Sequence, residues 1–450
     1  MYVKTCGISA SLLAIATETG LLEVLKSCFP TNWDNLLGAA FYMVSEGNVM
    51  MYIKDWFEEN KAYSIEAMND VDCSRLFESL SYAEKRKFFI EWIKYHEEQK
   101  HTVYDVTSIS THSKNIEIAE LGYNRDNEKL PQVNYGMFYG MSSMLPMYYN
   151  MYSGSIPDKT SLDFILANAK DIGIENTCMV FDRGFMTNDN ISLTLDSQYS
   201  FITALPRFRL EHDALVDGVQ GSIEKVENWI RDYKVYGISR PVSIENKQVY
   251  AHIYYDLERK STETKEHYSY VDKLQDELEH INQNKTIPRR YKEYFSITEQ
   301  SKASLTFKLD CEKVDEKQKR HGYFILLTNI PTLSSKDVLK IYRERDVIEK
   351  HFDMFKNDLE FGRLKTHGDK TTEGKMFVGF LALILRSHMH HTIKSNEDTK
   401  KMTFEKIMIE LRKIKIVAMS NMTEKLLTLT KTQKTILKAL NVDSEGFVDQ

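Results

Sequence analysis

Between Val103 and Ala204, strand-like and helix-like segments follow one another in an order that restricts the possible folds. Residues 103–108, 135–141 and 145–152 are rich in β-branched or aromatic residues, which is typical of strands. A helix is expected at about 161–170. A short apolar strand at 177–181, a second helix and another strand at 200–204 follow it. Three strands, a helix, a strand, a helix and a strand predict an α/β fold.

The rest of the chain divides by its pattern. Residues 1–100 are helical in character, and Ser81 with Glu84 forms a capping box at the start of one helix. A looser stretch contains a polar helix whose apolar seam is Tyr268, Val271, Leu274, Leu278 and Ile281. We expect five segments: N-terminal helical region 1–100, core 101–206, inserted and largely β subdomain 207–320, second part of the core 321–395, and basic helical region 396–450.

Composition excludes some classes of protein. The formal net charge is −6, whereas a protein that coats nucleic acid is usually basic. No run of about 18 uninterrupted apolar residues occurs, so no transmembrane helix and no membrane partner are expected. Five cysteines lie far apart without a CxxC pair, which favours reduced thiols in a cytoplasmic protein.

The run from Tyr342 to Lys356, YRERDVIEKHFDMFK, carries the clearest functional pattern. On a helix with about 100° per residue, Tyr342, Arg345, Glu349 and Lys356 fall on one narrow stripe. Beside them runs an apolar stripe that would face a core: Ile341, Ile348, Phe355 and Leu359. A phenol, a guanidinium, a carboxylate and an ammonium at the edge of a buried face suit a site that binds metal and phosphate. An ordinary surface helix with an Arg345–Glu349 i,i+4 pair is the alternative.

Two further carboxylates lie at positions where a charge needs a partner. Asp105 is within an apolar strand, and Asp182 directly follows another one and precedes Arg183. An ionised carboxylate in such surroundings is costly unless it is paired or bound to a metal. Asp105 could instead pair with Arg183, and Asp182 could simply begin a turn. Together with Glu349, however, the two would suit a pair of hard divalent cations.

These residues resemble the motifs of DDE transposases from bacterial insertion sequences. Tyr342, Arg345, Glu349 and Lys356 match every interval of the Y-R-E-K signature that marks one large group of them. The residues around Asp105 (YDVT) are similar to the first-aspartate motif of that group, and DRGF at 182–185 is similar to the second. The resemblance covers roughly residues 100 to 395.

The resemblance implies an RNase H-like catalytic core interrupted by a mixed, largely β insertion. It implies two Mg²⁺ or Mn²⁺ ions held by Asp105, Asp182 and Glu349, with Tyr342, Arg345 and Lys356 contacting phosphates. The partners would be transposon-end DNA and target DNA, with a homodimer in the DNA complex and a nucleoid location. By helical geometry Asp346 and Asp353 lie only about 40–60° from Glu349, and the family pattern favours Glu349.

The sequence leaves two alternative functions open, and it differs from the family pattern in some respects. A non-catalytic DNA-binding descendant of a transposase and an RNase H-like nuclease without strand transfer are the alternatives. Relatives often have residues before the helical segment, so we expect part of an end-recognition domain to be missing. Some relatives hold a flipped base with an aromatic residue of the insertion. Trp229 is the candidate here, although a tryptophan is more often part of a core.

Overall fold

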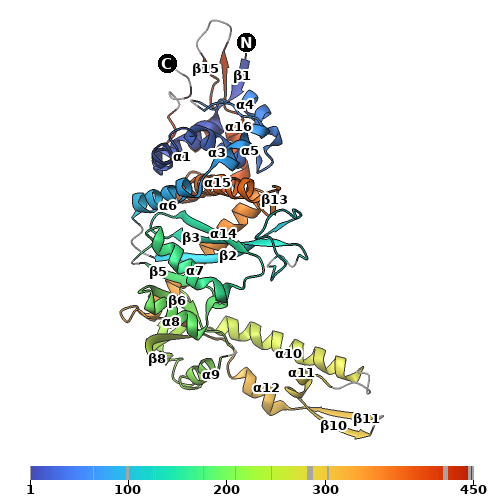
Figure 1. The fold of residues 1–450 in the computed structure, drawn as a ribbon. Coiled ribbons are helices and arrows are strands. Elements are labelled where there is room, and N and C mark those ends of the chain that lie inside the picture. The colour runs from blue at the N-terminus through green and yellow to red at the C-terminus, as the bar shows by residue number, and fades with distance from the viewer. Residues whose placement is uncertain are drawn as a thin grey trace. The chain divides into compact units, whose positions relative to one another are not determined.

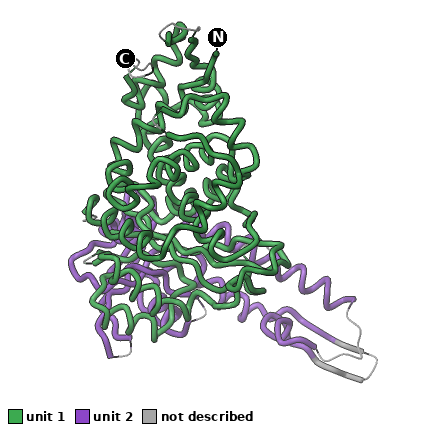
Figure 2. Tube along the Cα trace, turned by 45° about the horizontal axis from the view of Figure 1, so that its top comes forward, with its two compact units in different colours: residues 1–200, 344–450 green, residues 201–343 purple. Residues whose placement is uncertain are grey.

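The computed structural model describes residues 2–443 and 447, except 64, 98–100, 125, 127, 176, 208, 245, 281–286, 302–303 and 419–423. The chain forms two compact units (Figure 2). Unit 1 comprises residues 1–200 and 344–450, and unit 2 comprises residues 201–343. The expected insertion at 207–320 therefore falls within unit 2, whereas the three candidate carboxylates all belong to unit 1.

Unit 1 contains a mixed sheet in the strand order β4-β3-β2-β5 (Figure 1). Strand β2 is antiparallel to β3 and parallel to β5, and the short β13 adds to β2 in parallel. The strands have these bounds: β2 His101–Thr111, β3 Gln132–Gly140, β4 Leu145–Ser153, β5 Cys178–Phe181 and β13 Arg363–Leu364. The strands predicted from sequence at 103–108, 135–141, 145–152 and 177–181 are thus confirmed within a few residues.

Helices surround this sheet and form the N-terminal part of unit 1. Helices α6 and α15 pack against β4, while α14 packs against β2. Ser81 caps α6 through the capping box with Glu84 that the sequence predicts. The helices are α1 Gly7–Glu18, α2 Leu21–Cys28, α3 Trp33–Glu46, α4 Ile53–Glu59, α5 Asp70–Ser79, α6 Tyr82–His96, α7 Asp158–Asp171, α8 Asn188–Asp196, α14 Asp346–Asp353, α15 Asp369–Ser395, α16 Phe404–Arg412 and α17 Lys431–Ala439, with short helical turns at Met50–Tyr52 and Arg183–Phe185.

The two ends of the chain meet in a second, small sheet of unit 1 (Figure 1). Strand β1, Tyr2–Thr5, pairs antiparallel with β14, Lys415–Ala418, which pairs in turn with β15, Lys425–Leu426. The N-terminal helical region and the basic C-terminal region are therefore hydrogen-bonded to each other rather than independent.

The strands of unit 2 follow the order β6-β12-β9-β8-β7. Its elements are β6 Ser200–Ala204, α9 Leu210–Asp217, a helical turn at Val226–Asn228, β7 Trp229–Ile230, β8 Val235–Ile244, β9 Lys247–Tyr255, α10 Leu257–Glu279, α11 Arg289–Lys292, β10 Phe295–Ser301, β11 Ser304–Leu309, α12 Cys311–Gln318, β12 Tyr323–Thr328 and α13 Ser335–Arg343. Because α10 spans 23 residues, the segment is less rich in β structure than expected.

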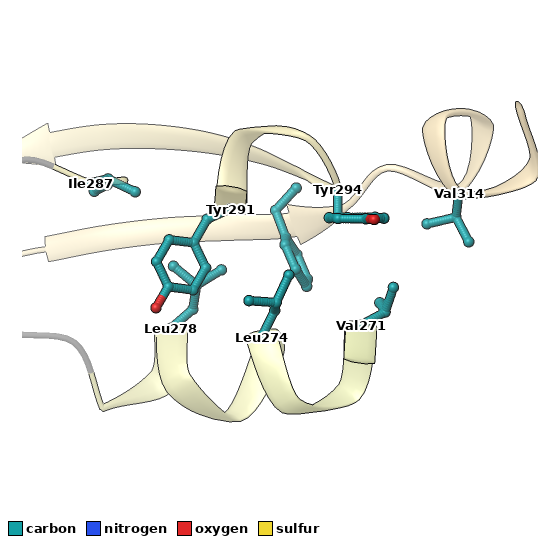
Figure 3. Close-up of a cluster of buried hydrophobic side chains, with 8 residues drawn as sticks. Val271, Leu274, Leu278, Ile287, Tyr291, Tyr294 and Val314 are labelled. Carbon is teal, nitrogen blue, oxygen red and sulfur yellow. The ribbon is translucent and has the colours of Figure 1, made fainter. Parts of the chain in front are cut away.

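A small separate core holds the outer part of unit 2 together. Val271, Leu274 and Leu278 of α10 face residues of α11, α12 and the β10–β11 hairpin (Figure 3). This confirms three residues of the seam predicted for the polar helix. Tyr268 is instead largely exposed, and Ile281 lies outside the described residues.

Within the described residues no single helix is long and apolar enough to span a membrane, although α1 and α2, bent by 78°, pass together on length and composition. The five cysteines are all free; Cys311 is exposed and the other four are buried.

Candidate active site

The three candidate carboxylates converge on one guanidinium in unit 1. One terminal nitrogen of Arg345 lies 3.3 Å from Asp182 and 3.7 Å from Asp105, and the other lies 2.9 Å from Glu349. The Arg345 side chain is only 16% exposed. Three carboxylates thus face one cation, so negative charge remains in excess in a partly buried place. A site of this kind attracts a further cation.

The sheet positions the two aspartates. Asp105 lies in the middle of β2 and is partly exposed. All of the remaining residues of this fully described strand are buried. One of its carboxylate oxygens accepts a hydrogen bond from the Val106 amide at 2.8 Å. Asp182 follows the last residue of β5, which runs parallel to β2 in the adjacent position. Neighbouring parallel strands therefore carry both side chains into the same region of the sheet.

Aromatic packing positions Glu349. On α14, Ile348 is fully buried while Glu349 is 55% exposed. Phe355 stacks on Tyr135 of β3 with ring centroids 4.9 Å apart, and Phe352 packs edge-on to the same ring. These contacts hold α14 against the sheet. The predicted apolar stripe is confirmed for Ile348, Phe355 and Leu359, which are fully buried, whereas Ile341 is half-buried.

The prediction of one continuous helix from Tyr342 to Lys356 is wrong. Helix α13 ends at Arg343, α14 begins at Asp346, and a π-helical segment, Met354–Asp358, follows α14. The amides of residues 347 and 348 bond to carbonyls three residues earlier, so the chain tightens where the helix breaks. Of the four signature residues, only Glu349 lies within α14, and Arg345 is the residue directly before this helix.

The remaining signature residues lie on other elements than α14. Tyr342 is a half-buried residue of α13 in unit 2, and unit 1 resumes at Glu344. Lys356 belongs to the π-helical segment, and its ammonium nitrogen lies 2.7 Å from the carboxylate of Asp126. Trp229, at the start of β7, is 38% exposed and packs against Tyr236, so it is not a core residue.

The three side chains paired with Arg345 are carboxylates, and carboxylate oxygens are ligands that Mg²⁺ and Mn²⁺ prefer. The three carboxylates therefore fit hard divalent cations, and the Arg345 guanidinium pairs with these same carboxylates. In the part of the chain that the structure describes, no group of three or more His, Cys, Asp or Glu side chains is close enough together to hold a metal ion. Each of the three carboxylates instead lies within 4 Å of a terminal nitrogen of Arg345.

Sequence reasoning missed several charged residues near this site. His101 is the first residue of β2, and one of its ring nitrogens lies 2.6 Å from the carboxylate of Glu344. Glu344 is the residue that precedes Arg345 in the sequence. Arg363 of β13 forms an ion pair with Glu128. No motif marks these residues, because their partners lie far away along the chain. Only the pairing of β13 with β2 would have indicated that Arg363 lies beside the strand that carries Asp105.

Comparison with known families identifies the class of protein. The sequence profile described as "Transposase DDE domain" matches residues 96–385, well over half of the chain. The chain therefore belongs to the DDE transposase family, whose members cut and join DNA. No curated protein sequence matches the chain. Among solved structures, a cryo-EM structure of the piggyBac transposase synaptic complex with hairpin DNA is similar. It has 10% identity and a TM-score of 0.42, with 85% of this chain and 70% of that chain covered.

Proposed function

We propose that this transposase cleaves transposon ends and joins them to target DNA by metal-dependent phosphoryl transfer. The observation that carries the proposal is the convergence of Asp105, Asp182 and Glu349 on the Arg345 guanidinium. A protein that only binds DNA has no use for three carboxylates directed at a negatively charged polymer. The family match over residues 96–385 supports the same reaction class.

In this proposal Asp105, Asp182 and Glu349 hold two Mg²⁺ or Mn²⁺ ions. When bound, such ions stabilise negative charge on the attacking and leaving oxygens of an in-line displacement. Arg345 then turns from the carboxylates to a phosphate, which its forked guanidinium can bind through two hydrogen bonds. Tyr342 and Lys356 contact phosphates near the cut end, Lys356 as a point charge.

The finer assignments are part of the same proposal. The Tyr342, Arg345, Glu349 and Lys356 intervals favour the Y-R-E-K group of bacterial insertion sequences, acting on DNA in the cytoplasm. The β4-β3-β2-β5 sheet, with its antiparallel strands followed by a parallel one, supports an RNase H-like core. We further propose that unit 2 contains the family's insertion and that a homodimer forms on DNA.

Substitution of each carboxylate tests the proposal. Asp105→Ala, Asp182→Ala and Glu349→Ala should each reduce end cleavage by at least about 10³-fold, equivalent to roughly 4 kcal/mol of transition-state stabilisation. Asp353→Ala is the matched control, since Asp353 is a carboxylate one turn further along α14 and should be dispensable. Each variant should melt cooperatively near the wild-type temperature. Wild-type cleavage by any one of the three would remove that residue from the metal site.

A non-catalytic DNA-binding protein is the second candidate. Arg345 already compensates the carboxylates in part, so the cluster could be a permanent ion-pair network. Titration with Mn²⁺ in the presence of DNA separates the two functions. Saturable binding that Asp105→Ala abolishes supports the enzyme, whereas no binding by the wild type supports the second candidate.

A further inference from the structure

A polar loop between β2 and β3 is anchored on the strand that carries Asp105. The Asn124 amide group donates a hydrogen bond to the Ser110 hydroxyl of β2 at 3.0 Å. Its carbonyl oxygen accepts hydrogen bonds from the amides of Asp126 and Glu128 at 2.8 and 3.3 Å. Asn124 is buried, with 7% exposure. One side chain therefore fixes the backbone that presents two carboxylates.

Each of these carboxylates binds a cation from the second part of the core. Asp126 lies 2.7 Å from the Lys356 nitrogen, and Glu128 is paired with Arg363. Lys356 is only 12% exposed in this arrangement. Arg363, and then the Ser110 hydroxyl, lower the pKa of the Glu128 carboxyl. Two neighbouring cations are thus both occupied by anions of one loop.

Arg363 lies beside the strand that carries Asp105. It pairs with Ser110 in the β13–β2 ladder, five residues along β2 from Asp105. At about 3.3 Å per residue this separation is roughly 17 Å along the strand. That distance corresponds to a few nucleotides of DNA backbone.

We propose that Arg363 is a further phosphate-binding residue and that Asp126 and Glu128 occupy, in the DNA-free protein, the places of two DNA phosphates on Lys356 and Arg363. The inference rests on the proposed function, because it assumes that DNA crosses this face. Carboxylate and phosphate oxygens bind the same cations with similar geometry. DNA must therefore displace the loop carboxylates, which makes the loop an internal competitor. Ion pairs with exposed partners contribute at most about 1 kcal/mol to stability, so DNA can break them.

Binding of a fluorescein-labelled duplex of arbitrary sequence, without divalent metal, tests this inference. Phosphate contacts carry no sequence information, so the native transposon ends are not required. Asp126→Asn and Glu128→Gln keep the side-chain shapes and should each tighten binding about two- to fivefold, the equivalent of one weak ion pair. Arg363→Gln should weaken binding and reduce the slope of log K against log salt by about one. In the Arg363→Gln background, Glu128→Gln should have no further effect.

The Arg86–Asp171 pair provides matched controls. It is another ion pair of unit 1, at 2.7 Å, and joins α6 to α7. Asp171→Asn changes the net charge and removes one ion pair as Glu128→Gln does, and Arg86→Gln does so as Arg363→Gln does. Both control variants should leave the DNA affinity and the salt slope at wild-type values. If Asp171→Asn tightens binding as much as Glu128→Gln, the loop acts through net charge alone and the competition is overturned.

Three other outcomes also overturn the inference. They are unchanged affinity and salt slope in Arg363→Gln, weaker or unchanged binding in both Asp126→Asn and Glu128→Gln, and no duplex binding by either the wild type or the doubly neutralised loop variant. Arg363→Lys, which retains the charge, distinguishes a phosphate contact from a folding defect, since it should recover most of the salt slope. These measurements use no metal and no cleavage. They can therefore contradict the inference about the loop while the cleavage tests of Asp105, Asp182 and Glu349 support the proposed function. They can also support the inference while the cleavage tests contradict that function.

Discussion

The Arg345 guanidinium lies 2.9 Å from the Glu349 carboxylate, and its other terminal nitrogen faces Asp105 and Asp182. An i,i+4 pair of this kind is ordinary on a helix surface. Here Arg345 also faces the carboxylates of Asp105 and Asp182, and its side chain is largely buried. Arg345 therefore compensates the same negative charge that divalent cations would compensate.

Removal of the guanidinium should strengthen the response to metal. Without metal, Arg345→Gln should lose roughly 1–3 kcal/mol of unfolding free energy, because three carboxylates then face one another uncompensated. Added Mn²⁺ should raise the melting temperature more in this variant than in the wild type, since ligand binding to the folded state stabilises it. Melting curves over a Mn²⁺ titration measure both effects.

Arg345→Lys is the matched variant, because it retains the charge and loses only the forked geometry. It should remain close to the wild type in metal-free stability. An equal Mn²⁺ response in Arg345→Gln and the wild type would contradict the idea that guanidinium and metal share the site.

Stability should fall in mild acid because of His351. This residue of α14 is buried, its ring packs against Tyr139, and burial lowers its pKa from 6.5 to about 4. The unfolded chain therefore binds the proton first as the pH falls. The contribution of neutral His351 to the free energy of unfolding is complete above about pH 6.5. It is lost progressively towards pH 4, at no more than roughly 1.4 kcal/mol per pH unit.

Urea unfolding at about pH 5 and about pH 7 measures this dependence in the wild type and in His351→Phe. The variant keeps an aromatic ring against Tyr139 and should show a smaller loss of stability in acid. Some loss should remain, because burial also lowers the pKa of His252, in unit 2, to about 4. The same pH dependence in both proteins would exclude His351 as a source.

Gly136 of β3 should not tolerate a methyl group. A Cβ atom there would overlap the Tyr104 hydroxyl and come within 2.5 Å of the Asn150 amide oxygen. These two groups are hydrogen-bonded to each other at 3.2 Å. Gly136→Ala should cost roughly 1–3 kcal/mol of unfolding free energy, as overpacking usually does.

Gly368→Ala provides the comparison, because a Cβ at that position would meet no atom within 4 Å. It should unfold at nearly the same urea concentration as the wild type. Equal midpoints for Gly136→Ala and the wild type would show that Tyr104 and Asn150 can move aside.

The strand expected at 135–141 also illustrates what local pattern can establish. Its aromatic residues predict a strand, and β3, Gln132–Gly140, confirms it. The same holds for the Ser81 capping box and for the strands that carry Asp105 and Asp182. In each case, the signal lies within a few consecutive residues: β-branched or aromatic residues for the strands, and Ser81 with Glu84 for the cap.

The break before α14 and the π-helical segment after it could not be predicted in this way. Residues 342–356 have the composition of one helix, and the packing of Phe352 and Phe355 on Tyr135, a residue more than 200 positions earlier, does not appear in that local pattern. A similar limit applies to Lys356, whose partner Asp126 lies 230 positions away.

The sequence by itself predicted Asp105, Asp182 and Glu349 as the residues that carry the chemistry, because they stand at positions where a charge must be compensated. The motifs around them predicted a DDE transposase, and the match of the transposase domain to residues 96–385 confirms the family. Only the tertiary structure decided what compensates them in the protein alone, namely Arg345 between the carboxylates and a loop that binds Lys356 and Arg363. The physical reason is that burial is encoded by local pattern, whereas ion pairs depend on distances between segments that only the folded chain brings together.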